Sequence, residues 1–221
     1  LFLYGNEVLK NNPNKKRVGI HFNKVVNNNR KNLVNHLYEF DHNNLFFTVN
    51  TECYDNHKNN IKTNYNSPYK NPNIQQYGLS YHLYIDSFLN LNIKSEMEFI
   101  YETFTVENEK LFTKWTEKTI KHLYLGKPFI HIDHRAHNLL EKNGFKPYKP
   151  LFTNELWDSY QSNTTNTELI LNNIKWLCSM DESEWVQRIT ESNIISSQNR
   201  DRVMELIFNT SLMNYIKDIK G

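Results

Sequence analysis

The sequence has little of what marks several common protein classes. Its 221 residues contain two cysteines, Cys53 and Cys178, which are too few for a disulfide framework. No run of 18 apolar residues occurs, so we expect no membrane span. Neither sign of charge is in excess, since the formal net charge is +2. This near-neutral balance argues against a dedicated duplex-DNA binder, which needs a basic face.

Asparagine, in contrast, is abundant, with 34 residues against only six glycines and six prolines. Asparagine is unfavourable inside helices and strands and favourable in turns and caps. Its excess, together with many Lys, Ile and Tyr residues, indicates an AT-rich coding genome, such as that of a low-GC virus, protist or bacterium. Only four of the asparagines fall within residues 94–160, where the motifs described below are found.

The hydrophobic pattern predicts an α/β fold. Alternating apolar residues within 15–26 predict a strand, and apolar residues spaced by three and four from Leu33 to Tyr38 predict a helix before a second strand at 45–50. This β-α-β order is typical of a Rossmann-like unit with a crossover helix. Further predicted elements are strands at 94–102 and 129–132, a strand or extended segment from 145, a loop at 105–112, and helices at 115–125, 138–143, 165–180, 182–190 and 200–216.

We therefore expect a Rossmann-like parallel sheet with a helical C-terminal region, divided into residues 1–93 and 94–221. The chain begins with Leu1 rather than Met, so we expect the first portion to be truncated.

Three charged residues predict a nucleotide site in the second portion. Glu102 follows a predicted strand, and Glu117 and Lys118 begin the next predicted helix. Ligands of open α/β sheets bind at the carboxyl ends of strands, against helix N-termini. A carboxylate there accepts ribose hydroxyls, and a lysine neutralises a diphosphate with help from the helix dipole.

These residues resemble the donor-binding half of glycosyltransferases with the GT-B fold, of the α-1,3-fucosyltransferase type. A related group of viral and bacterial putative glycosyltransferases is closer still. The shared motifs are the T-E-K-T helix start at residues 116–119, the G-K-P-F-I strand at 126–130, the L-x-x-x-G-F segment at 140–145 and the segment at 155–160. The resemblance covers roughly residues 15–50 and 94–178.

The resemblance implies a metal-independent transferase of the hexosyl or fucosyl type that uses a nucleotide-sugar donor and needs no cofactor. Glu117 would hold the ribose, next to Thr116 in the same motif. Lys118 would hold the donor diphosphate, and Glu102 would stabilise the oxocarbenium-like transition state of the sugar. The acceptor would be a hydroxyl of a glycan, a protein or a nucleic acid, and we expect a cytoplasmic location, either host or viral-factory.

Other residues at strand and helix ends leave two interpretations open. Arg30, at a predicted helix start, is a candidate phosphate ligand or a solvated cation. Asp133 lies in the run His131-Ile132-Asp133-His134-Arg135-Ala136-His137, whose histidines suggest either a metal site or, as we prefer, the lining of the donor pocket. We expect Asp133 to bind the donor.

Two departures from the family pattern keep other functions open. Asp133 stands near the position where the group has glycine, and Thr103 where fucosyltransferases have asparagine after the strand-end glutamate. One alternative is a non-catalytic structural or binding protein that retains the fold. A weaker one is a single-stranded nucleic-acid binder that uses the aromatic and basic residues of 61–81.

Overall fold

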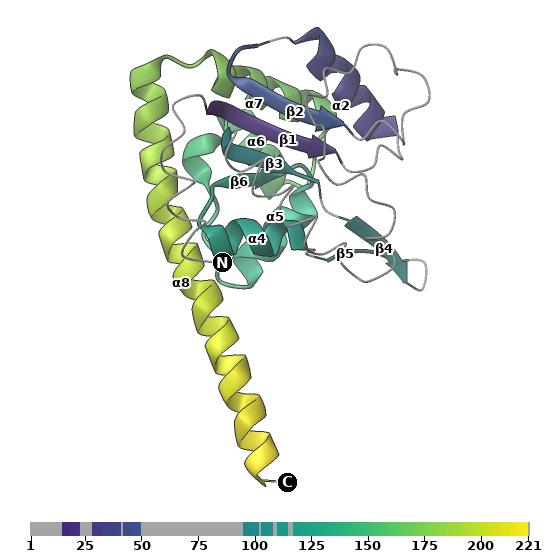
Figure 1. Ribbon diagram of the computed structural model, residues 1–221. Coiled ribbons are helices and arrows are strands. Elements are labelled where there is room, and N and C mark those ends of the chain that lie inside the picture. Colours follow the sequence, from purple (N-terminus) through teal and green to yellow (C-terminus); the bar gives the residue numbers. More distant parts are fainter. Residues whose placement is uncertain are drawn as a thin grey trace, which may run out of the picture. The chain divides into compact units, whose positions relative to one another are not determined.

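The computed structural model describes residues 15–22, 28–40, 42–49, 95–101, 103–107, 110–114 and 117–220 (Figure 1). They belong to two compact units, Leu1–Phe99 and Ile100–Gly221, called here the N-terminal and C-terminal units. The boundary falls within strand β3 (Ser95–Ile100). The last residue of this strand, Ile100, is therefore part of the C-terminal unit, which also contains the candidate site.

The described part of the N-terminal unit contains parallel strands and a helix. Strand β1 (Lys16–Phe22) lies between β2 (Leu45–Val49) and β3, and Val18 is the partner of Leu45 on one side and of Met97 on the other. Helix α2 (Asn28–Glu39) connects β1 to β2. The predicted β-α-β unit is thus confirmed.

The core of this unit consists of the residues that gave the sequence its periodicity. Val18 and Ile20 are buried on β1, and Leu33, Val34 and Leu37 are buried on α2. The spacing of the three helical residues places them on one face of α2, and burial of that face stabilises the crossover.

The strand order of the sheet is β2-β1-β3-β6, with all four strands parallel, where β6 is Phe129–His131. A parallel sheet accompanied by helices confirms the predicted α/β class. The strands at 15–26, 45–50, 94–102 and 129–132 were all predicted at nearly these positions. None of the helices in the described ranges combines the length and apolar character that crossing a bilayer requires.

The C-terminal unit contains most of the helices. After β3 the chain forms the antiparallel hairpin β4–β5, and β6 then follows between helices in the sequence. The elements are β4 (Thr103–Glu107), β5 (Lys110–Lys114), α4 (Glu117–Leu125), β6, α5 (His134–Lys142), the 3₁₀ helix η3 (Lys149–Leu151), α6 (Asn154–Gln161), α7 (Thr167–Ser179) and α8 (Glu182–Lys220).

Two predictions in this region were wrong. The loop predicted at 105–112 is the hairpin β4–β5. The local sequence gives no clear pattern from which its cross-strand pairing could be predicted. The separate helices predicted at 182–190 and 200–216 are one helix, α8. Of the strand or extended segment predicted from Phe145, no strand forms: residues 145–148 have no regular structure, and η3 follows. The short helix α6 was not predicted.

Polar side chains of α7 and α8 fasten the irregular segment at 145–153. Asn199 accepts a hydrogen bond from the backbone N of Lys146 (2.7 Å) and donates one to its carbonyl oxygen (2.8 Å). Asn173 makes the corresponding pair with Thr153 N (2.6 Å) and Leu151 O (3.0 Å). Both asparagine side chains are buried, so they satisfy backbone groups that no secondary structure pairs.

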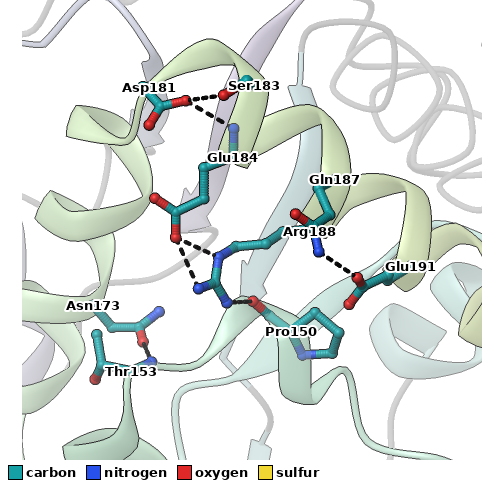
Figure 2. A network of polar contacts seen from close by, with 9 residues as sticks. All are labelled: Pro150, Thr153, Asn173, Asp181, Ser183, Glu184, Gln187, Arg188 and Glu191. Carbon is teal, nitrogen blue, oxygen red and sulfur yellow. Dashed lines mark hydrogen bonds and ion pairs between the residues drawn. The ribbon is translucent and has the colours of Figure 1, made fainter.

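Figure 2 shows a related contact at the start of α8. The guanidinium of Arg188 donates to Glu184 Oε1 (2.8 Å) and to the carbonyl oxygen of Pro150 (2.9 Å). Asp181 accepts hydrogen bonds from Ser183 Oγ and from the backbone N of Glu184, which caps the helix. The first turns of α8 are therefore fixed to η3 by a charge-assisted bond.

Replacement of the buried Asn199 by alanine should destabilise the C-terminal unit. Asn199→Ala leaves the N–H and carbonyl of Lys146 without their side-chain partner, so we expect a loss of about 1–3 kcal/mol in the free energy of unfolding. Urea denaturation measures it. Ser197→Ala, at an exposed position on the same helix, is the control and should change stability by less than about 0.5 kcal/mol. Equal effects of the two changes would contradict this role.

Glycine at position 19 is required by the close approach of β3. A Cβ there would lie 2.3 Å from Ser95 Oγ and 2.8 Å from Ser95 Cβ. We expect Gly19→Ala to destabilise the protein by about 1–3 kcal/mol through overpacking. The double variant Gly19→Ala/Ser95→Gly removes both clashing atoms, so part of the stability should return. Strictly additive losses in denaturation experiments would refute the steric explanation.

Candidate functional site

The candidate site lies where β3 and β6 end, within the C-terminal unit. The backbone N of Ile132, just after β6, donates a hydrogen bond to the carbonyl oxygen of Ile100, the last residue of β3 (2.9 Å). The residues that follow, Tyr101 and Asp133, therefore leave neighbouring strands at the same edge. In open parallel sheets this edge is where ligands bind.

Lys118 reaches this edge from the first turn of α4. Its Nζ donates a hydrogen bond to the carbonyl oxygen of Tyr101 (3.1 Å). The ammonium group thus lies at the residue that precedes Glu102 in the sequence. The helix start and the strand end that the sequence assigned to one site are brought together at this point.

The other predicted donor ligands are only partly described. Glu102 and Thr116 lie outside the described residues, as do the side chains of Glu117 and Arg30. By backbone, Glu117 is the first residue of α4 and Arg30 lies in α2 of the N-terminal unit. The roles expected for these four residues stay predictions.

The side-chain carboxylate of Asp133 accepts three hydrogen bonds from Arg135. Its Oδ1 accepts hydrogen bonds from the backbone N (2.8 Å) and from Nε (2.9 Å) of Arg135, and its Oδ2 accepts one from Nη2 (2.8 Å). The first bond makes Asp133 the N-cap of α5. The side-chain bonds form a bidentate ion pair and raise the pKa of Arg135. The carboxylate expected to bind a donor thus holds a guanidinium at the strand end.

Tyr160 of α6 contacts the end of strand β6. Its ring is fully buried, and its hydroxyl donates a hydrogen bond to the carbonyl oxygen of His131. Burial raises the pKa of Tyr160 well above its usual range, and the neighbouring Asp133 and Tyr101 raise it further. The hydroxyl therefore stays protonated, and it is close to both residues that leave the strands.

Sequence reasoning gave neither Arg135 nor Tyr160 a role. Tyr160 closes the segment at 155–160 that carries the family resemblance, and this position was the available signal. Arg135 lies two residues after Asp133, at a helix start. An acidic N-cap followed by an arginine is a local signal for the ion pair between Asp133 and Arg135. It does not indicate that β3 ends beside this pair.

Two histidines of this region, His131 and His137, are buried. His131 Nε2 lies 2.8 Å from Thr119 Oγ1, and burial lowers the pKa of His131 well below its usual range, with smaller contributions from His137 and His122. The ring of His137 contacts the rings of Phe152, Trp157 and Tyr160. Burial lowers the pKa of His137 to about 4.

These histidines do not form a metal centre with their neighbours. Nowhere in the described residues do three or more His, Cys, Asp or Glu side chains converge so that they could hold a metal ion. Whether the protein uses a metal stays a prediction from the family resemblance, since Glu102 and other residues lie outside the described ranges.

The low pKa of His137 makes stability depend on pH. The unfolded chain, in which histidine has a pKa near 6.5, binds more protons than the folded one between pH 6.5 and 4. The contribution of His137 to the free energy of unfolding is therefore fully present above about pH 6.5. It falls by about 3 kcal/mol as the pH decreases toward 4.

His137→Phe should flatten that loss by a similar amount, measured by urea denaturation between pH 4 and 7. Phe152→Leu disturbs the same ring contacts without removing a titrating group, so it should lower stability equally at each pH. An unchanged pH dependence in His137→Phe would show that this ring is not the titrating group.

Comparison of the chain with protein-family models, with curated proteins and with solved structures finds no match. The functional argument therefore depends on the geometry of the strand ends and on the sequence motifs.

Proposed function

We propose that the protein is a glycosyltransferase that transfers a sugar from a nucleoside-diphosphate donor to a hydroxyl acceptor. The observation that carries this proposal is the hydrogen bond from Lys118 to Tyr101. It places a cation, at a helix start, against the carboxyl end of a parallel strand, which is where α/β proteins bind phosphates. The finer GT-B assignment, the acceptor and a cytoplasmic location are part of the proposal and rest on the sequence.

In the proposed reaction the bond between the anomeric carbon and the diphosphate breaks as the acceptor oxygen attacks that carbon. Negative charge develops on the leaving diphosphate, and Lys118 stabilises it there more strongly than in the ground state. The role proposed for Glu102 is to stabilise the positive charge that develops on the sugar ring. A general base takes the proton of the acceptor hydroxyl as the new bond forms.

The alternative is a non-catalytic protein that retains the fold, and ligand binding separates the two. Thermal unfolding of the full chain should be measured with UDP, GDP, CDP, ADP and dTDP. At a hundredfold excess over Kd, the fitting nucleotide adds about 2.7 kcal/mol of stability. That corresponds to roughly 5–10 °C in Tm for a chain of this size.

Lys118→Ala should abolish the shift, because it removes the cation that holds the diphosphate. Lys142→Ala, at an exposed position in the last turn of α5, also removes one positive charge and should preserve it. Each variant's Tm without nucleotide checks its folding. No shift with any nucleotide would favour the non-catalytic alternative, and a full shift in Lys118→Ala would place the nucleotide elsewhere.

A further inference from the structure

We propose that the last turns of helix α8 pair with α8 of a second copy of this chain, in antiparallel orientation. The interface is separate from the candidate nucleotide site and does not depend on the proposed function. It rests on the two sides of α8, which differ in burial, and on the charge at the two ends of the exposed side.

One side of α8 packs against its own unit. Between residues 182 and 206 the buried residues recur at intervals of seven, four, three and four positions: Trp185, Ser192, Ser196, Asn199 and Val203. These intervals keep them on one side of the helix. Ser196 and Asn199 bond to residues of the segment 145–153, so this side is occupied.

The opposite side of α8 is exposed to solvent. Ile194 is 57% exposed, and Asp201 and Glu205, seven and eleven positions later, are exposed too. At about 3.6 residues per turn these three positions lie about half a turn away from the buried ones. Met204, next to them on the helix surface, is 46% exposed. This side of the helix is therefore available to a partner.

The exposed side becomes apolar in the last turns of α8. From Glu205 the same line continues in steps of three and four positions. Its next members, called here the apolar line, are Phe208, Leu212, Tyr215 and Ile219. The helix extends through all four, since α8 ends at Lys220. Apolar residues at alternating intervals of three and four are the pattern with which two helices pack along each other. Four such positions make a short contact, so we expect a weak dimer whose population depends on concentration.

Charge at the two ends of the apolar line favours a second copy in antiparallel orientation. Residues 201–206 contain two acidic residues and one basic residue, whereas residues 217–220 contain two basic residues and one acidic residue. The two ends therefore carry net charges of opposite sign. Antiparallel pairing about the middle of the apolar line brings the acidic end of each copy next to the basic end of the other, with Glu205 beside Lys220 of the second copy. Parallel pairing would bring like charges together.

A membrane surface fits this side of the helix less well. Helices that lie in a membrane interface are rich in lysine and arginine on their polar face and are attracted to anionic lipids. Residues 201–220 contain three acidic and three basic residues, so they have no net charge to attract such lipids. The carboxylates of Asp201 and Glu205, in line with the apolar positions, would also lie at the lipid surface.

Sedimentation velocity of the full chain, over about a hundredfold range of concentration, measures the dimer. Leu212→Glu places a charge in the middle of the apolar line and should weaken dimerisation by about tenfold or more. Asn214→Glu introduces the same charge eleven positions after the buried Val203, on the other side of the helix, so it should leave the dimer unchanged. The Tm of each variant checks its folding.

Glu205→Lys tests the orientation. In the antiparallel pair it turns an attraction to Lys220 into a repulsion, so we expect the Kd of the dimer to rise by roughly three- to tenfold. The double variant Glu205→Lys/Lys220→Glu restores opposite charges across the dimer, and its Kd should return toward that of the wild type. The ion pair of Glu205 with Arg202 in its own helix (2.8 Å) is lost in both variants, so the recovery isolates the contact between copies. Glu141→Lys, at an exposed position in α5, makes the same charge change and should have no effect.

The outcomes decide between the possible partners of this side of α8. A dimer that Leu212→Glu weakens and Asn214→Glu does not would support the interface. A monomer at every concentration, or equal effects of these two variants, would overturn it. A Kd that Glu205→Lys leaves unchanged would overturn the antiparallel orientation. Binding of a monomeric wild type to vesicles of phosphatidylcholine and phosphatidylserine, lost in Leu212→Glu, would assign the exposed side to a membrane surface and also overturn the proposal.

Discussion

The alignment of two strand ends is the constraint on which the candidate site depends. Because Ile132 bonds to Ile100, the chain leaves β3 and β6 at one edge, and helices α4 and α5 begin close to it. Lys118 can then bond to Tyr101, and Asp133 can cap α5 while it holds Arg135. Parallel strands place their carboxyl ends together by geometry, so residues more than 30 positions apart converge without any direct bond between their side chains.

A series of polar contacts connects the C-terminal helices to that edge. Asn199 and Asn173 bond to the backbone at the two ends of the irregular segment 145–153. Thr153, at the end of this segment, caps α6, and α6 carries Tyr160, whose hydroxyl bonds to His131. The two asparagines satisfy backbone groups on either side of the short 3₁₀ helix η3, so the segment has a fixed path with little regular structure. We interpret the C-terminal helices as the support that holds the strand end in place.

The sequence predicted elements well where the spacing of apolar residues agreed with residues that begin or end an element. Strand β1 and helix α2 were found from the spacing of their apolar residues, and α4 ends at Leu125, directly before Gly126, whose φ is +64°. The prediction failed where long-range contacts decide. The strands of the hairpin β4–β5 are stabilised by pairing with each other, and α6, with eight residues, is too short for its period to be visible.

Helix α8 was divided in the prediction because its centre contains serines and asparagines, which are poor helix formers. In the structure Ser192, Ser196 and Asn199 are buried, and the last two bond to residues of the segment 145–153. These polar residues make tertiary contacts and do not interrupt the helix. Packing therefore overrides their low helix propensity.

The sequence by itself determined the α/β class, the helix start that carries Lys118 and the strand end that precedes Asp133, since all three follow from local spacing. Only the tertiary structure decided what these groups contact. It showed that Lys118 bonds to the residue directly after β3, that Arg135 bonds to Asp133 and that the hydroxyl of Tyr160 bonds to His131 at the end of β6. Local patterns fix which residues stand at the end of an element, whereas the order of strands in the sheet determines which ends are neighbours.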